Sequence, residues 1–215
     1  MRNYQYILFD LDGTLTDPGE GITNSVAYAL KKFGIEVADR TLLYPFIGPP
    51  LIESFMKYYH FSKEEAEQAV VYYREYFGDR GIFENTPYDG IRDVLETLSK
   101  NGKTLVLATS KPEPYARRIL EHFDLAQYFT YIAGASFDES RSEKWDVIEY
   151  ALSAMKISDR SKAIMIGDRK HDAIGAHKTG LACIGVLWGY GDLEELTAAG
   201  VDVTVEHIEQ LKSIL

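Results

Sequence analysis

Five short apolar runs punctuate the chain, each bounded by polar or turn-forming residues. They occupy residues 6–9, 104–108, 131–133, 163–166 and 182–186. Continuous apolar runs of this length are typical of strands covered on both faces, as in a parallel sheet. Helical patterns separate the later runs, at residues 113–123, 144–155 and 171–179. This alternation predicts a doubly wound, Rossmann-like α/β core.

The stretch between the first and second runs breaks the alternation. It carries almost no strand signal, and its apolar residues recur at three- and four-residue steps. They are Ile22, Val26, Leu30 and Phe33, then Leu51, Ile52 and Phe55, then Ala66, Val70, Tyr73 and Phe77. Such spacing predicts amphipathic helices that pack together. We therefore expect a smaller all-helical domain over residues 17–84, inserted into a core of residues 1–16 and 85–215. Because ligands of such sheets bind at the carboxyl ends of strands, the insert is a candidate lid.

Composition narrows the possible partners. The formal net charge of −10 argues against a nucleic-acid polymer, which needs a basic face on the protein. No apolar run reaches the roughly 18 residues of a membrane span, and residues 1–4 open no signal-peptide pattern. The single cysteine, Cys183, fits a reducing cytoplasm, and its apolar neighbours favour a small buried side chain over a nucleophile. We expect a cytoplasmic protein, either monomeric or a small homo-oligomer.

Two aspartates follow the first apolar run. Asp10 and Asp12 are separated by one residue and followed by Gly13. Alternate side chains of an extended segment share one side, so the two carboxylates can address one space. Their mutual repulsion is relieved by a hard divalent cation such as Mg²⁺. Gly13 permits a close backbone approach or an unusual dihedral angle. Alone, this segment is equally compatible with an ordinary turn.

Polar residues also follow three later segments of the core. Thr109 and Ser110 follow the second run, and Lys144 opens the helical pattern after the third. Asp168 and Asp172 follow the fourth. Singly, each has an ordinary reading: a helix cap, a surface lysine, or acids at a helix start.

Together, in this order, the four segments resemble the four motifs of the haloacid dehalogenase (HAD) superfamily. The similarity covers the whole chain, and the position and helical character of the insert resemble a C1-type cap. Residues 46–51 are similar to the cap loop of the phosphoglycolate phosphatase-like branch, and residues 87–90 to its return into the core. The resemblance implies a magnesium-dependent phosphomonoester hydrolase.

The resemblance also implies catalytic roles. Asp10 corresponds to the nucleophile that forms an aspartyl-phosphate, and Asp12 to the general acid and base. Mg²⁺ is expected on the Asp10 carboxylate, the Asp12 carbonyl and Asp168. Asp172 either assists through a water or orients Lys144.

Phosphate binding is assigned in the same way. Thr109, with Ser110 as a weaker candidate, is expected to donate to a phosphoryl oxygen, and Lys144 to neutralise charge. The amides of Gly13 and Thr14 are further candidate donors. Gly48 and Pro49 of the cap loop are expected to contact the leaving group, so that changes at Pro49 or Pro50 alter substrate preference.

Some residues depart from the phosphoglycolate phosphatase pattern. Trp145 stands where a proline commonly follows the lysine. Residues 136–141 and 147–152 look closer to a bacterial 5′-nucleotidase-like subgroup, although Glu139 replaces an expected glycine. The expected substrate is a small phosphorylated metabolite, either a nucleoside 5′-monophosphate or phosphoglycolate.

Other functions stay open at this point. A sugar-phosphate mutase resembling β-phosphoglucomutase would keep Asp10 and Asp12, and a non-catalytic binding module could share the scaffold. A dehalogenase would need neither Asp12 nor Asp168. His171 is expected at a helix start without a catalytic role. The tyrosines of the insert are expected to belong to its core and surface rather than to stack on a nucleobase.

Overall fold

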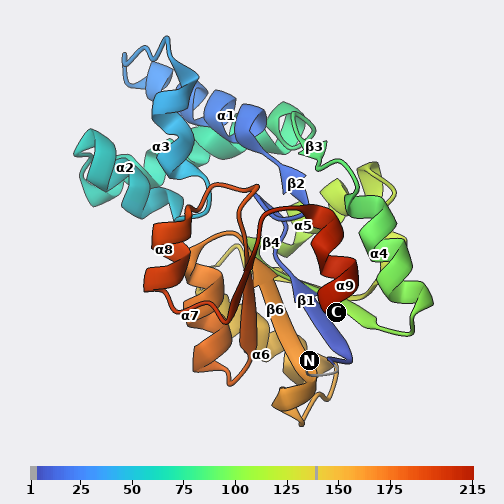
Figure 1. The fold of residues 1–215 in the computed structure, drawn as a ribbon. Coiled ribbons are helices and arrows are strands. Elements are labelled where there is room, and N and C mark those ends of the chain that lie inside the picture. The colour runs from blue at the N-terminus through green and yellow to red at the C-terminus, as the bar shows by residue number, and fades with distance from the viewer. Residues whose placement is uncertain (1–3, 139) are drawn as a thin grey trace. The chain divides into compact units, whose positions relative to one another are not determined.

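The computed structural model describes residues 4–138 and 140–215 (Figure 1). Glu139, singled out above, lies outside the described residues. The chain divides into two compact units. One joins the N-terminal segment up to Thr16 with Pro87–Leu215, and the other is Asp17–Thr86. We call them the core unit and the helical insert.

The core unit is built on a six-stranded sheet with the strand order β5-β4-β1-β6-β7-β8. Every pairing in it is parallel. The strands are β1 (Tyr6–Phe9), β4 (Thr104–Pro112), β5 (Phe129–Ala135), β6 (Ala163–Gly167), β7 (Ala182–Val186) and β8 (Val203–Val205). β1 therefore lies inside the sheet, between β4 and β6. The chain leaves β1 toward β4 on one side, and β6 lies on the other, so the strand order reverses at β1, which is where ligands of such sheets bind.

Helices cover both faces of this sheet (Figure 1). α6 and α7 pack against each other and against the central strands on one face, whereas α4 and α5 contact the sheet from the other. The α-helices of the core unit are α4 (Ile91–Lys100), α5 (Glu113–His122), α6 (Lys144–Ala154), α7 (Lys170–Lys178), α8 (Leu193–Ala198) and α9 (Leu211–Ile214). Short 3₁₀ turns are η3 (Ala126–Tyr128), η4 (Arg160–Lys162) and η5 (Ile208–Gln210).

One hydrophobic cluster fills the space between the sheet and the α6–α7 layer. The strands contribute alternate residues, such as Leu8, Val106 and Met165, since neighbouring residues of a strand point to opposite faces. α6 contributes Val147, Ile148, Ala151 and Leu152, at helical spacing. Burial of these side chains stabilises the layer that carries Lys144 and Asp172 at its helix starts.

The helical insert consists of three α-helices and two short helical turns. They are α1 (Gly19–Lys32), η1 (Arg40–Phe46), α2 (Leu51–Tyr59), α3 (Lys63–Tyr76) and η2 (Phe77–Gly81). α3 begins with a capping box, in which Ser62 and Glu65 exchange side-chain-to-backbone hydrogen bonds. The short strands β2 (Thr16–Asp17) and β3 (Thr86–Pro87) pair where the chain leaves and re-enters the core sequence.

Several aromatic side chains of the insert contact one another. Phe46 contacts the rings of Phe55, Tyr58 and Tyr59, and Tyr73 stacks on Phe77 at 5.3 Å. Phe46, Phe55, Tyr73 and Phe77 are buried, whereas Tyr58 is exposed at the surface of the insert.

The predicted fold class is confirmed: a parallel α/β core with a helical insert after the first strand. Cys183 is fully buried, as predicted, and its burial raises the pKa of its thiol. β4 and β5 are longer than predicted, since their ladder continues past the apolar residues to Pro112 and Ala135. Among the described residues, no helix is long and apolar enough to cross a membrane.

Candidate active site

The carboxyl ends of β1, β4 and β6 meet at the centre of the sheet. Phe9 is in register with Leu107 on one side and Ile166 on the other, and Asp10 N donates to Ile166 O at 2.9 Å. The polar residues that follow these strands therefore come together, although they are far apart in sequence.

Three carboxylates form the centre of this site. One oxygen each from Asp10, Asp168 and Asp172 lies within 4.8 Å of the others, and all three residues are buried. Burial, with Asp172 nearby, raises the pKa of Asp168 to about 8. Burial also raises the pKa of Asp172 to about 6, although Lys144 opposes the shift. Such crowding of acids is relieved by a cation.

Lys144 supplies part of the positive charge. Its Nζ lies 2.9 Å from Asp10 Oδ2 and 2.8 Å from Asp172 Oδ1, and it donates to Ala108 O at 3.3 Å. Burial alone would lower the pKa of Lys144, but the two carboxylates outweigh it and raise the pKa. The lysine is therefore charged and fixed between the ends of β4, α6 and α7.

Asp12 is held apart from this cluster. Its Oδ2 lies 2.9 Å from Lys111 Nζ, whereas its Oδ1 is buried and accepts no hydrogen bond from the part of the chain that the structure describes. Burial raises the pKa of the Asp12 carboxyl, and the charge of Lys111 opposes the rise. The two aspartates of the first motif thus have separate lysine partners.

Gly13 adopts a turn conformation next to Asp168 of the carboxylate cluster. Its φ of +78° lies in the left-handed region, so the predicted unusual dihedral angle is present. A Cβ at this position would lie 2.1 Å from Asp168 Oδ2. The amides proposed above as phosphate donors have partners within the loop. Gly13 N donates to Thr16 O, and Thr14 N donates to Leu11 O. The Thr14 hydroxyl donates to Asp168 Oδ1 at 3.4 Å and so supports a carboxylate of the cluster.

The loop after β7 adds contacts that the sequence analysis missed. Tyr190 N donates to Asp168 Oδ2 at 2.8 Å, and Trp188 Nε1 donates to Thr14 O at 3.1 Å. Gly189 fits tightly, because a Cβ there would lie 2.3 Å from Gly13 O. The only sequence signal was a glycine-rich segment at the end of a predicted strand, residues 188–191.

The other residues singled out in the sequence lie in three separate parts of the fold: strand β4, helix α7 and the helical insert. Thr109 is buried at the end of β4, where its hydroxyl accepts from Lys111 N at 3.2 Å, and Ser110 beside it is partly buried. His171 lies in the first turn of α7, and its burial lowers its pKa. Gly48 and Pro49 belong to the helical insert, between η1 and α2, and thus to a different unit from the carboxylates.

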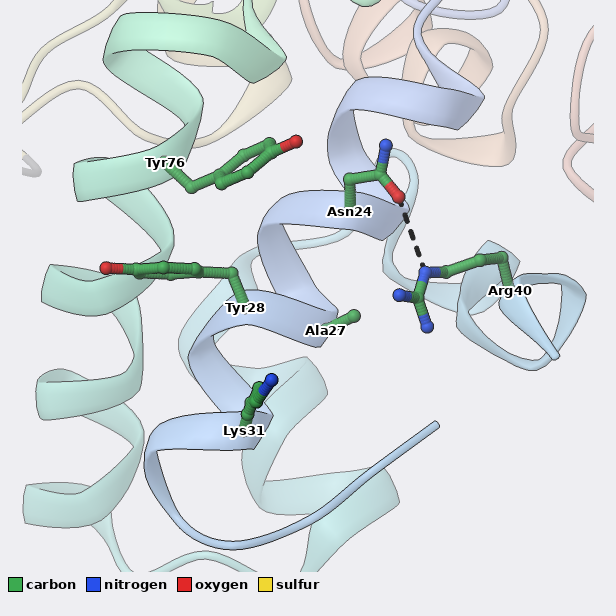
Figure 2. Close-up of a pocket in the computed structure, with 6 residues that line it drawn as sticks. All are labelled: Asn24, Ala27, Tyr28, Lys31, Arg40 and Tyr76. Carbon is green, nitrogen blue, oxygen red and sulfur yellow. Dashed lines mark hydrogen bonds between the residues drawn. The ribbon is translucent and has the colours of Figure 1, made fainter. Parts of the chain in front are cut away.

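A hollow of about 250 Å³ lies within the helical insert (Figure 2). It is lined by Asn24, Ala27, Tyr28, Lys31, Arg40 and Tyr76. Arg40 Nε donates to Asn24 Oδ1 at 3.4 Å, and the rings of Tyr28 and Tyr76 are 5.5 Å apart. None of the lining residues is an acid, and both of its cations are exposed. The candidate chemistry therefore lies with the buried carboxylates of the core unit.

Comparison with known families agrees with this geometry. The family model described as haloacid dehalogenase-like hydrolase matches residues 7–186, which include every carboxylate and lysine of the site. The chain belongs to this HAD-like hydrolase family. The predicted family membership and the assignment as a hydrolase are confirmed.

Relatives of this HAD-like hydrolase include phosphatases. It is 47% identical to a 5′-nucleotidase of Pseudomonas aeruginosa, across 91% of this chain and 88% of the relative. It superimposes with a TM-score of 0.94 and 52% identity on the crystal structure of a predicted phosphatase from Clostridium acetobutylicum, across 98% and 97% of the two chains. It is also 41% identical to tyrosine-protein kinase PtkA of Mycobacterium tuberculosis, across 98% of this chain and 72% of the relative. The HAD-like hydrolase thus has relatives named as phosphatases, one of them a 5′-nucleotidase.

Proposed function

We propose that this chain hydrolyses a small phosphate monoester in a magnesium-dependent reaction, with Asp10 as the covalent nucleophile. The observation that carries the proposal is the separation of two carboxylates. Asp10 shares a cluster with Asp168, Asp172 and Lys144, whereas Asp12 stands beside it with Lys111. One aspartate thereby pairs with Lys144 inside the cluster, and the other lies in a buried place suited to proton transfer.

The donor set fits Mg²⁺. Carboxylate oxygens are the ligands that this hard cation prefers, and Asp10, Asp168 and Asp172 bring three within 4.8 Å of one another. Asp168 is held in place by hydrogen bonds from the Thr14 hydroxyl and from Tyr190 N. Bound there, Mg²⁺ would supply Lewis-acid stabilisation of phosphoryl charge. Asp10 and Asp168 would hold it, with Asp172 placed either to assist or to orient Lys144.

The first half of the reaction forms the covalent intermediate. The Asp10 carboxylate attacks phosphorus, an Asp10 oxygen–phosphorus bond forms, and the bond from phosphorus to the ester oxygen breaks. An alkoxide is a poor leaving group, so protonated Asp12 gives its proton to that oxygen and an alcohol departs. Lys144, already bound to Asp10, opposes the negative charge of the phosphoryl group.

The second half restores the enzyme. Asp12 accepts a proton from a water molecule, the water oxygen attacks phosphorus, and inorganic phosphate leaves as the Asp10 carboxylate is regenerated. The same carboxyl serves as acid and then as base, so each step prepares it for the next. We assign this exchange to Oδ1 of Asp12, which is buried and has no hydrogen-bond partner among the described residues.

The substrate is proposed from the relatives. A 5′-nucleotidase is 47% identical to this chain, whereas a phosphoglycolate phosphatase of Haemophilus influenzae is 26% identical. We therefore place nucleoside 5′-monophosphates ahead of phosphoglycolate as substrates. The contact of Gly48 and Pro49 with the leaving group remains a prediction.

Magnesium-dependent phosphate release tests the proposal directly. The native protein and Asp10→Asn are assayed side by side on nucleoside 5′-monophosphates, phosphoglycolate and sugar phosphates, with and without a chelator. We expect release by the native protein that is lost on chelation and lost in Asp10→Asn. Asp124→Asn is the matched control, since Asp124 is exposed and its φ of +52° is one that asparagine tolerates.

Three outcomes would count against the proposal. Activity that survives in Asp10→Asn would reject the nucleophile, and activity that survives chelation would reject the metal. Conversion between sugar phosphates without phosphate release would identify a mutase instead.

A further inference from the structure

Lys111 is a buried cation without a role in the scheme above. It lies near the end of β4, and its side chain is 5% exposed. Its backbone is restrained, because Lys111 N donates to the Thr109 hydroxyl at 3.2 Å and Pro112 follows it. A residue before proline is confined to extended conformations, which suits its place in the strand.

The side chain of Lys111 reaches the carboxyl of Asp12. Nζ lies 2.9 Å from Oδ2, and the Asp12 side chain is 15% exposed. A charge-assisted hydrogen bond between partners this well buried is strong and directional. Oδ1 of the same carboxyl is buried and has no hydrogen-bond partner among the described residues. The two oxygens of Asp12 are therefore not equivalent in this fold: Oδ2 pairs with a cation, and Oδ1 has no hydrogen-bond partner among the described residues.

Lys144 does not supply this restraint. Its Nζ contacts Asp10 and Asp172, both in the carboxylate cluster, at 2.9 and 2.8 Å. Each of the two aspartates therefore has its own lysine: Lys144 contacts Asp10, and Lys111 contacts Asp12. If Lys111 served only to bind phosphate, its ammonium group would not need to form an ion pair with Asp12 Oδ2.

We propose that Lys111 is a positioning residue, which fixes the Asp12 carboxyl through Oδ2 so that Oδ1 is the oxygen that exchanges the proton with the ester oxygen and then with water. This inference rests on the proposed function, because it assigns Asp12 the proton-transfer role. A carboxyl free to rotate about its terminal bond would present either oxygen, in many orientations. When the carboxyl is fixed in one orientation, the entropic cost of orienting it no longer adds to the activation free energy.

Leaving groups of different basicity separate this role from others. An alkyl phosphate, such as a nucleoside 5′-monophosphate, needs a proton on its departing oxygen, whereas p-nitrophenyl phosphate scarcely does. The value of kcat/KM reports the steps up to formation of the aspartyl-phosphate, so comparing it between the two substrates isolates the acid step. General-acid catalysis contributes about 100- to 10,000-fold in total, so a misplaced acid should lose part of that range.

The experiment measures kcat/KM of Lys111→Met, Lys111→Arg and Lys111→Gln, each alone and with Asp12→Asn. We expect Lys111→Met to lose about 10- to 100-fold on the nucleoside monophosphate and much less on p-nitrophenyl phosphate. Lys111→Arg should recover most of the loss, because it restores a cation beside Oδ2. In the Asp12→Asn background, Lys111→Met should change little, because the group that it positions is already disabled. Affinity for Mg²⁺ should be unchanged throughout.

Each contrary result has a distinct meaning. A rise in KM that persists in the Asp12→Asn background would show that Lys111 binds substrate directly and would overturn the positioning role alone. Equal losses on both substrates would do the same. An inactive native protein would overturn the proposed function and this role with it. Should Lys111→Met fail to fold because it leaves a buried carboxylate unpaired, Lys111→Gln and the double variant carry the comparison.

Discussion

Gly13 lies directly against Asp168: a Cβ at position 13 would be 2.1 Å from Asp168 Oδ2. We expect Gly13→Ala to push this carboxylate out of the cluster, with loss of Mg²⁺ binding and at least about 100-fold lower kcat, because positioned charge dominates phosphoryl transfer. Isothermal titration with Mg²⁺ and a phosphate-release assay measure the two effects.

Gly102→Ala is the matched control for that variant. Gly102 has a φ of +80°, close to that of Gly13, but no atom lies within 4 Å of its missing Cβ. Both variants should lose about 1–2 kcal/mol of stability from the left-handed backbone, and only Gly13→Ala should lose the metal. Equal Mg²⁺ affinity in the two variants would contradict the close approach.

Lys144→Met should lower the free energy of unfolding, because the carboxylates of the cluster then repel one another without a compensating positive charge. The substitution leaves two buried carboxylates without their lysine, and breaking a buried ion pair from one side typically costs about 3–5 kcal/mol. Denaturant unfolding without Mg²⁺ measures the loss. Lys100→Met is the control, since the Lys100 side chain is 72% exposed and pairs with Glu96 at the surface, where such pairs contribute little.

The stability loss of Lys144→Met should depend on pH in a defined direction. Burial raises the pKa of Asp172 to about 6 even with Lys144 beside it, so removal of the lysine raises it further. The folded variant then binds a proton that the unfolded chain releases, and its stability falls as the pH rises through this raised value. The gap between variant and native protein should therefore be wider at about pH 8 than at about pH 6. A gap that is constant across this range would show that Asp172 is not the responding group.

Binding of Mg²⁺ should release a proton near neutral pH. In the metal-free protein, burial and the nearby Asp172 raise the pKa of Asp168 to about 8, so this carboxyl is mostly protonated at about pH 7. A hard cation binds the carboxylate and displaces the proton, and affinity should fall about tenfold for each unit of pH below this pKa. Titration calorimetry in buffers with different ionisation enthalpies counts the proton. Affinity that is flat from about pH 6 to about pH 9 would contradict the raised pKa.

Cys183 should resist alkylation in the folded protein. It is fully buried in the cluster beneath α7, and burial raises the pKa of its thiol, so little reactive thiolate is present. Iodoacetamide should label native protein far more slowly than protein unfolded in urea, and phosphatase activity should survive the treatment. Rapid labelling of the active protein would mean that this layer opens easily.

Much of the core could be predicted because each strand is a short apolar run with a polar residue at its end. β1 and β7 match their predicted bounds, since both are flanked by clear breaks. Helix α4 has no counterpart among the predicted elements, although Ile91, Val94, Leu95 and Leu98 are buried at helical steps. Strand β8 has three residues, two of them exposed, and such a segment carries no hydrophobic pattern.

The site was predictable only as a set of residue types. Asp10, Asp168 and Lys144 stand at ends of elements that a parallel sheet brings to one edge, so their proximity follows from topology. The partner of each charge does not follow. Lys111 pairs with Asp12 and Lys144 with Asp10 because of side-chain length and packing, and residue spacing in the sequence does not predict these pairings. The bond from Tyr190 N to Asp168 is likewise a backbone contact without a sequence signature.

The central place of β1 also governs how the site behaves over time. β1 is hydrogen-bonded to β4 on one side and to β6 on the other, whereas β8 lies at an edge of the sheet. Backbone amides in such a strand exchange with solvent only in the rarest openings of the molecule, while edges and termini exchange in frequent local ones. The backbone that carries Asp10 is therefore among the last parts of the chain to open, and the nucleophile keeps its place through most fluctuations of the surrounding fold.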